Sequence, residues 1–227
     1  MSMIIYDCEQ RSLEWMRLRT GRITASNAHR LTTDAKRETY QYALLAETIT
    51  GLLDETFVSD AMQWGIDQEE FAMEWYEKQD PSRELRRVGF CQSKEFLIAG
   101  CSPDLLVDED GLCEIKCPTS KNHLLYWNEG PSSEYIYQMQ FQMLITGREW
   151  TDFLTYDPRF PSAFQGKVHH IKRDEKIIGK LIKGIKEIEL FIDTFMLDNN
   201  AKSYIDIPSQ ENEKYIPEYL PEDYLMV

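Results

Sequence analysis

Residues 102–117 read SPDLLVDEDGLCEIKC and decide how the middle of the chain folds. Two short apolar-rich runs, residues 104–107 and 112–117, flank the sequence Asp108-Glu109-Asp110-Gly111. Acidic residues followed by glycine between two such runs are typical of a hairpin turn. The sequence therefore predicts an antiparallel hairpin at the centre of the fold.

Hydrophobic periodicity on both sides of this hairpin predicts further helices and strands. The expected helices span residues 12–19, 24–31, 38–53, 59–79, 120–127, 134–145 and 174–197, and the other expected strands span residues 85–91, 96–99, 150–156 and 167–171. Helices that flank a central group of strands predict an α/β (α+β) fold. We expect residues 1–205 to form one domain and residues 206–227, with six acids and three prolines, to form an acidic tail or arm.

The hairpin brings together the side chains that suggest chemistry. Residues two apart on a strand share a face, so Glu114 and Lys116 point together while Ile115 turns into the core. Antiparallel pairing can place Asp104 beside them. Two carboxylates with the Ile115 carbonyl suit Mg²⁺, and an ammonium can orient water and stabilise charge on a phosphate. The alternative is an ordinary solvated sheet face, on which a Glu-x-Lys pair is common.

Glu69 is a second candidate acid, on the expected helix over residues 59–79. A helical wheel places it beside Met73 and Tyr76 on a largely apolar side, away from the acidic face of the helix. A carboxylate in that position requires a partner such as a metal ion or a cation. Alternatively, this helix has a broad solvated face.

The net charge of the chain argues against certain classes of function. The 227 residues carry a net charge of −14, which argues against a general nucleic-acid coat and against an anionic membrane surface. Basic residues are concentrated locally: residues 11–37 and residues 167–186 each hold seven basic against two acidic side chains. The five cysteines lack zinc-site spacing, and no signal peptide or membrane span is expected, which favours a cytoplasmic protein.

Five motifs, taken in order, resemble one family. They are Glu14-Trp15-x-x-Leu18-Arg19-x-Gly21-x-Ile23-Thr24-Ala25-Ser26, Trp64-Gly65-x-x-x-Glu69, Ser102-Pro103-Asp104, Glu114-Ile115-Lys116-Cys117-Pro118 and Tyr135-x-x-Gln138-x-Gln140. Together they resemble the lambda exonuclease family, the phage-encoded YqaJ-type recombination exonucleases of the PD-(D/E)XK superfamily. The resemblance implies a restriction-endonuclease-like core with a central mixed β-sheet flanked by helices.

The resemblance also implies roles for individual residues. Asp104, Glu114 and Glu69, with the Ile115 carbonyl, are the expected metal ligands, and Lys116 is the expected lysine beside the attacking water. Gln138 is expected to contact water or phosphate in the active site, where ordinary packing is the alternative. The DNA-binding residues that it implies are Arg19, Arg22, Thr24, Ser26 and Tyr135.

The segment around Arg19 and Ser26 resembles the part of the family that receives the 5′ end of DNA. Arginine binds phosphate through two parallel hydrogen bonds, and hydroxyls near a helix start add donors. For both Arg19 and Arg22 the alternative is a solvated helix end, and for Ser26 it is a plain polar residue.

The family implies a Mg²⁺-dependent 5′-to-3′ double-stranded DNA exonuclease, with Mn²⁺ as a possible substitute, that releases 5′-mononucleotides and leaves 3′ overhangs. It also implies a homotrimeric ring around DNA and a single-strand annealing protein as partner in recombination. No iron–sulfur cluster is expected, because no cysteine follows Cys117. Two alternatives remain open: an endonuclease on the same fold, and a non-catalytic interaction module.

Overall fold

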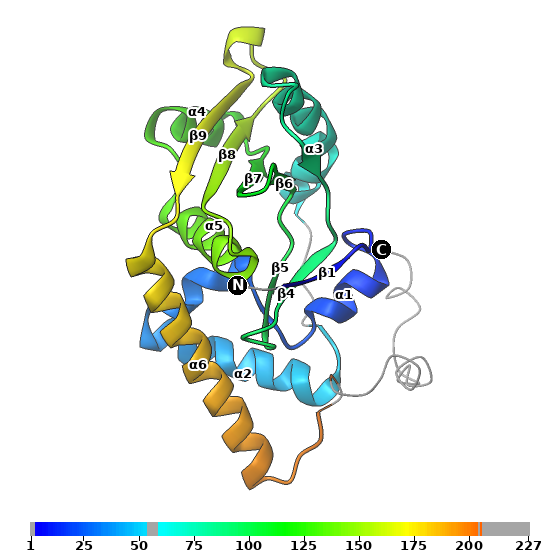
Figure 1. Ribbon diagram of the computed structural model, residues 1–227, viewed down its shortest axis with the longest axis vertical. Coiled ribbons are helices and arrows are strands. Elements are labelled where there is room, and N and C mark those ends of the chain that lie inside the picture. The colour runs from blue at the N-terminus through cyan, green and yellow to red at the C-terminus, as the bar shows by residue number, and fades with distance from the viewer. Residues whose placement is uncertain (1–2, 54–58, 204, 206–227) are drawn as a thin grey trace.

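The computed structural model describes residues 3–53, 59–203 and 205 (Figure 1). Its elements, in chain order, are β1 (Met3–Tyr6), α1 (Leu13–Arg19), β2 (Ile23–Thr24), the 3₁₀ helix η1 (Ala25–Thr32), α2 (Asp34–Thr50), α3 (Asp60–Gln79), β3 (Leu85–Arg86), β4 (Phe90–Ser93), β5 (Ala99–Cys101), β6 (Leu105–Val107), β7 (Gly111–Lys116), α4 (Ser120–Glu129), α5 (Ser133–Thr146), β8 (Trp150–Tyr156), the 3₁₀ helix η2 (Ser162–Phe164), β9 (Gly166–Lys172) and α6 (Glu175–Asp198). None of the helices described is long and apolar enough to cross a membrane. The expected tail, residues 206–227, lies outside the described residues.

The strands form two sheets. One has five strands in the order β3-β6-β7-β8-β9, and the other has four strands in the order β1-β4-β5-β2. In the five-stranded sheet β7 and β8 run parallel, and the other neighbouring strands run antiparallel. The mixed sheet flanked by helices that the sequence predicted is therefore confirmed. The second sheet was not predicted as a separate unit.

Helices cover both faces of the five-stranded sheet. On one face α3 buries Ala72 and Tyr76 in a cluster that includes Ile115. On the other face α5 is buried along residues 139–146 and packs in the larger cluster with Phe153. Figure 1 shows α2 and α6 at the far end of the molecule from α3. Every side chain of β7 is therefore enclosed except near its end.

The prediction of a single strand over residues 85–91 is wrong. Two short strands, β3 and β4, form there instead and belong to different sheets. Between them the chain crosses the N-terminal segment at Gly89, where a Cβ atom would lie 2.2 Å from the Cys8 carbonyl oxygen. Only glycine permits so close an approach of two backbones, and the crossing separates the two strands.

The strand expected over residues 96–99 is also displaced, because β5 begins only at Ala99. The Ser93 hydroxyl accepts hydrogen bonds from the amides of Glu95 and Phe96, at 3.2 and 3.0 Å. These bonds form a turn that delays the start of the strand.

The N-terminal third differs from expectation in four places, one of which is the short strand β2 (Ile23–Thr24), which was not predicted. Strand β1, which pairs with β4, was not predicted, because four residues give too short a pattern to recognise. The helix expected over residues 24–31 is the 3₁₀ helix η1. The helix expected over residues 38–53 begins earlier, at Asp34, and ends where Gly51 adopts a left-handed conformation that only glycine takes readily.

Candidate active site

The predicted hairpin forms from β6 and β7 and places the first two candidate acids together. Its register pairs Leu105 with Cys113, so Asp104 lies beside Glu114. The Ile115 amide donates a hydrogen bond of 2.6 Å to Asp104 Oδ2. Burial and the neighbouring Glu114 charge raise the pKa of Asp104 well above its usual range. The two carboxylates therefore repel each other, and this repulsion favours a cation between them.

Glu114 is the most tightly held acid of the group. Its side chain is 2% exposed, and it points away from Ile115 toward α5. Gln138 Nε2 donates to Oε1 at 2.6 Å, and Gln142 Nε2 donates to Oε2 at 2.6 Å. Lys116 forms an ion pair with Oε1. Both carboxylate oxygens are thus fixed by donors from three side chains.

Lys116 lies between this carboxylate and an aromatic ring. Its Nζ is 5.0 Å from the centre of the Tyr135 ring, close enough for a cation–π contact. Burial acts to lower the pKa of Lys116, but the charges of Glu114 and Asp104 outweigh it, so the pKa is raised. The lysine is therefore protonated at neutral pH and available as a hydrogen-bond donor.

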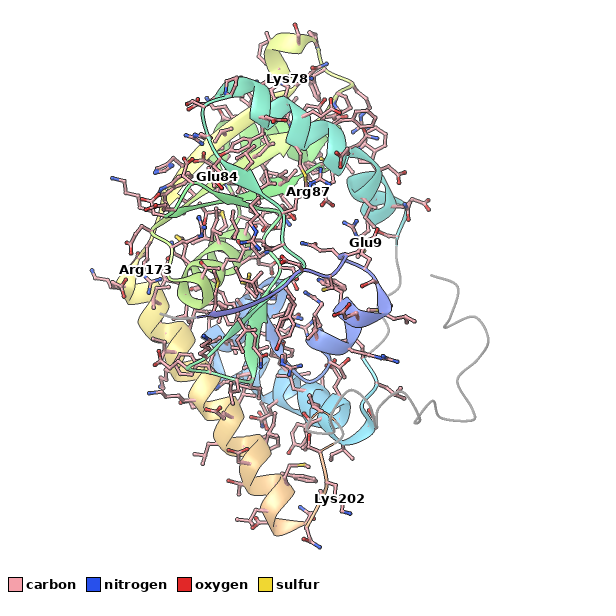
Figure 2. The ribbon with its side chains drawn as sticks, turned by 45° about the vertical axis from the view of Figure 1, so that its right-hand side comes forward. Glu9, Lys78, Glu84, Arg87, Arg173 and Lys202 are labelled. Atoms are coloured by element: carbon pink, nitrogen blue, oxygen red, sulfur yellow. The ribbon has the colours of Figure 1, made fainter. Side chains whose placement is uncertain are left out.

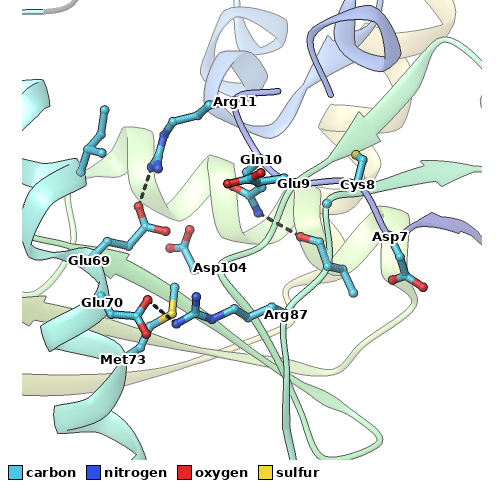
Figure 3. A pocket seen from close by; sticks show the side chains of 13 residues that line it. Asp7, Cys8, Glu9, Gln10, Arg11, Glu69, Glu70, Met73, Arg87 and Asp104 are labelled. Atoms are coloured by element: carbon cyan, nitrogen blue, oxygen red, sulfur yellow. Dashed lines mark hydrogen bonds and ion pairs between the residues drawn. The ribbon is translucent and has the colours of Figure 1, made fainter. Parts of the chain in front are cut away.

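Glu69 faces the same region from α3, on the side of the helix that buries Met73. It lines a pocket of about 390 Å³ together with Asp104 and residues of the segment before α1. Figure 3 shows Asp104 beside Glu69, and Arg11 reaching Glu69 from the opposite wall. Arg11 Nη2 lies 2.5 Å from Glu69 Oε2. The partner that we expected for the Glu69 carboxylate is therefore the Arg11 guanidinium.

The walls of this pocket come from distant parts of the chain. Gln10 Nε2 donates to the carbonyl oxygens of Val88 and Pro103, at 3.0 and 3.3 Å, and so ties the N-terminal segment to the Pro103-Asp104 turn. Glu9 and Arg87 both line the pocket and are labelled below α3 in Figure 2, where Arg87 Nη2 donates to Glu70 Oε2 at 2.6 Å. The N-terminal segment is therefore part of the candidate site.

The donor set fits a hard divalent cation, because carboxylates with a backbone carbonyl are the ligands that Mg²⁺ and Mn²⁺ prefer. Asp104, Glu114 and Glu69 approach from three different elements. In the part of the chain that the structure describes, however, no three acidic, histidine or cysteine side chains are close enough to form a ready-made metal cluster. Glu69 instead bonds Arg11, and Glu114 bonds its own donors. The metal roles of these residues stay a prediction.

The candidate 5′-end segment lies next to the strand that leads to Asp104. Strand β2 pairs in parallel with β5. Trp15 on α1 donates from Nε1 to the Ser102 hydroxyl at 2.8 Å, and the Arg19 guanidinium carbon lies 4.1 Å from the centre of the Trp15 ring. Burial lowers the pKa of Arg19, although the group stays charged at neutral pH. Trp15 therefore contacts both the Arg19 guanidinium and Ser102, which precedes Asp104 by two residues.

Three of the other predicted DNA-binding residues, Arg22, Thr24 and Ser26, follow Arg19 within a few positions, whereas Tyr135 lies on α5 against Lys116. Thr24 is buried, and its hydroxyl oxygen lies 3.4 Å from the hydroxyl oxygen of the exposed Ser26. Asn27 Nδ2 donates a hydrogen bond of 3.2 Å to the same Thr24 hydroxyl. Arg22 turns back onto α1, where Nη1 donates to the Leu18 carbonyl at 2.8 Å. Ser26 is thus exposed to a ligand, whereas one edge of Arg22 is used within the protein.

Two residues of the site were not among the predicted ones. Gln142 contacts Glu114 directly, and its spacing of four residues from Gln138 on α5 was the available signal. Arg11 reaches Glu69 from a left-handed backbone conformation, with φ of 71°, which is uncommon for a residue other than glycine. No local pattern indicates such a conformation in advance.

Comparisons with known proteins identify the family and the fold of this chain. The family described as YqaJ-like viral recombinase domain matches residues 14–149. An alkaline exonuclease from Laribacter hongkongensis, LHK-Exo, is 33% identical, with a TM-score of 0.75 over 83% of this chain and 98% of that one. Its complex with dAMP gives 33% identity and a TM-score of 0.76 over the same shares.

A phage-related exonuclease from Haemophilus somnus 129PT shares the fold, with 13% identity and a TM-score of 0.60 over 78% of this chain and 96% of that one. No curated protein sequence matches this chain.

Proposed function

Because this chain belongs to the YqaJ-like viral recombinase family and is a nuclease homologous to phage-type alkaline exonucleases, we propose that it is a Mg²⁺-dependent 5′-to-3′ exonuclease on double-stranded DNA. It releases 5′-mononucleotides and leaves 3′ single-stranded overhangs. The resemblance drawn from the five motifs is confirmed by the match over residues 14–149. Residues 1–205 are proposed as its catalytic domain.

The observation that carries this proposal is the group formed by Asp104, Glu114 and Lys116 on the hairpin. Asp104, Glu114, Glu69 and the Ile115 carbonyl are the residues that would hold Mg²⁺. When bound, Mg²⁺ supplies Lewis acidity that stabilises negative charge developing on the phosphate.

The remaining steps belong to the side chains of the chain itself. The protonated Lys116 orients the attacking water and faces the phosphate charge, and Gln138 donates to water or phosphate beside Glu114. Water gives up a proton to solvent as its oxygen forms the new bond to phosphorus. The bond from phosphorus to the 3′ oxygen of the terminal nucleotide breaks, and that oxygen takes up a proton to become the 3′ hydroxyl of the released nucleotide. The phosphate stays on the shortened strand, so each cycle leaves a new 5′-phosphorylated end.

Such an end is a suitable ligand for the segment around Arg19. We assign the terminal phosphate to Arg19 and Ser26, with Thr24, Arg22 and Tyr135 as further DNA contacts. The support is the stacking of Arg19 on Trp15 and the bond from Trp15 to the turn before Asp104. Recognition of the end and cleavage would then take place on neighbouring elements.

The assembly and partners belong to the same proposal. The dAMP complex of LHK-Exo supports a nucleotide as ligand of this chain. We propose a homotrimeric ring that encloses DNA, a phage-type single-strand annealing protein as partner in recombination, and the cytoplasm as the place of action. The acidic net charge agrees with an enzyme that slides along DNA without tight nonspecific adhesion.

The test uses linear duplex DNA with 5′-phosphate or 5′-hydroxyl ends and Mg²⁺, with the wild type and the Asp104→Ala variant. Wild type should release nucleotides from linear DNA and leave covalently closed circles intact. Asp104→Ala should release none. Equal release by both proteins would refute the site, and rapid cutting of closed circles would instead favour an endonuclease on the same fold.

A further inference from the structure

Arg159, on the loop that follows β8, is held in a fixed position by its neighbours. Arg159 donates from Nε to Asp157 Oδ1 at 2.7 Å and from Nη2 to Asp157 Oδ2 at 2.8 Å. Asp157 is fully buried, and Ser120, the first residue of α4, also donates to Oδ2 at 2.8 Å. Burial acts to raise the pKa of Asp157, but these donors outweigh it and lower the pKa. One edge of the guanidinium is therefore bound to a carboxylate that is ionised at neutral pH.

The flat face of the same guanidinium is held by Trp64. The Arg159 Cζ atom lies 4.3 Å from the centre of the Trp64 ring. The Trp64 Nε1 donor is buried and has no acceptor among the residues that the structure describes, which is uncommon in folded proteins. We call Trp64, Asp157 and Arg159 the arginine shelf. Its carboxylate and its ring fix both the position and the plane of the cation.

The other edge of the guanidinium is available to a ligand. The Arg159 side chain is 47% exposed, whereas that of Asp157 is not exposed at all. Within residues 3–53, 59–203 and 205, Nη1 has no hydrogen-bond partner. A planar cation with one edge anchored and the other open is suited to a phosphate, which accepts two parallel hydrogen bonds from such an edge. The Trp64 ring excludes base stacking on its own side.

The arginine shelf lies beside the candidate active site. Lys116 on β7 pairs with Thr155 on β8, and Asp157 follows Thr155 by two residues, about 7 Å further along the strand direction. Trp64 precedes Glu69 on the same helix, α3. The shelf thus shares α3 with Glu69, and its other two residues follow the strand that pairs with β7.

We propose that Arg159 binds a backbone phosphate of the DNA strand in the active site, at a nucleotide separate from the one that is cut. This inference rests on the proposed function, because it takes DNA as the substrate. Arg159 then fixes the position of the DNA strand along the active site. The base sequence of the DNA does not affect this contact, because phosphate contacts position a nucleic acid without reading its bases. In a chain of net charge −14, one immobilised cation gives the phosphate a defined place to bind.

The test compares DNA affinity in a double variant that keeps the net charge. Asp157→Asn with Arg159→Gln removes the buried anion together with its cation and retains amide groups of similar shape. Duplex binding is followed by fluorescence anisotropy with a chelator present, so that no hydrolysis occurs, between about 50 and 200 mM salt. We expect the Kd to rise about tenfold, and the slope of its logarithm against the logarithm of salt to fall by about 0.9.

The control is Lys172→Gln, an exposed cation at the other end of the same sheet, where Lys172 pairs with Trp150. It should change neither Kd nor slope by a comparable amount. A double variant that binds with the wild-type Kd and slope would overturn the inference, and so would equal losses in the double variant and the control.

The single variant Arg159→Lys serves if the double variant does not fold, because lysine keeps the charge but loses the planar fork. Several-fold weaker binding by Arg159→Lys supports the inference, and wild-type affinity overturns it. Failure of the wild type itself to bind duplex would refute the proposed function and this inference with it, whereas tight wild-type binding with unaffected variants refutes the inference alone.

Discussion

Replacing Gln142 by methionine removes one of the donors that hold Glu114. Gln142 Nε2 lies 2.6 Å from Glu114 Oε2, and the glutamine is fully buried on α5. Methionine is unbranched and of similar length, so it fills the same space without a polar group. The variant therefore leaves Oε2 without a side-chain donor while Gln138 and Lys116 continue to bind Oε1.

The expected loss follows from this single bond. A hydrogen bond to a charged group contributes about 1.5–3 kcal/mol, which corresponds to a factor of about 10 to 150 in affinity. Loss of a residue that orients a metal ligand commonly costs about 10- to 100-fold in metal affinity. We therefore expect Gln142→Met to bind Mn²⁺ about 10- to 100-fold more weakly in calorimetry, and to need correspondingly more Mg²⁺ for half-maximal nuclease rate.

Gln140 provides a matched control on the same helix. It is 1% exposed, but its partners are the Lys172 carbonyl and the Asp174 amide, both at 2.8 Å. Gln140→Met should lower the free energy of unfolding by about 1–3 kcal/mol and leave Mn²⁺ affinity unchanged. Wild-type Mn²⁺ affinity in Gln142→Met, or an equal loss in both variants, would refute the reasoning that Gln142 orients a metal ligand.

Three further predictions concern other parts of the chain. Arg19→Ala should abolish the preference for 5′-phosphorylated over 5′-hydroxyl ends, and an unchanged preference in a nuclease assay would place the phosphate site elsewhere. The lowered pKa of Asp157 stabilises the fold above about pH 3.9, its value in unfolded chains, and this stabilisation is lost as the pH falls through the folded-state pKa. The stability difference between wild type and Asp157→Asn in urea should therefore shrink from about pH 7 to about pH 3; a constant difference would contradict it. Gly111→Ala should cost about 1–3 kcal/mol of unfolding free energy, because the new Cβ would lie 2.0 Å from the Trp150 ring; thermal melting checks this, and an unchanged Tm would count against it.

The parts of the site that could be predicted from the sequence depend on local patterns. The hairpin follows from turn residues between two short runs, and the shared face of Glu114 and Lys116 follows from the alternation of a strand. The position of Asp104 follows once the turn length sets the register, Leu105 to Cys113. Residue chemistry suggested their metal and catalytic roles, the family resemblance implied the same roles, and these roles stay predictions.

The parts that could not be predicted depend on contacts between distant residues. Nothing near Gly89 indicates that Cys8 will cross it and divide the expected strand in two. Arg11 and Glu69 are separated by 58 residues, and their pairing requires both the left-handed backbone at Arg11 and the docking of α3. Such features depend on tertiary packing, which no window of local sequence contains.

The parallel pairing of β7 with β8 also affects the order in which a newly made chain can acquire its site. Parallel neighbours need a crossover between them, and here α4 and α5 supply it. Gln138 and Gln142 follow Glu114 by 24 and 28 residues. In a chain emerging from the ribosome, the hairpin that carries Asp104 and Glu114 is therefore made well before the two glutamines that donate to Glu114. A polypeptide interrupted before α5 lacks both of the glutamines that donate to Glu114.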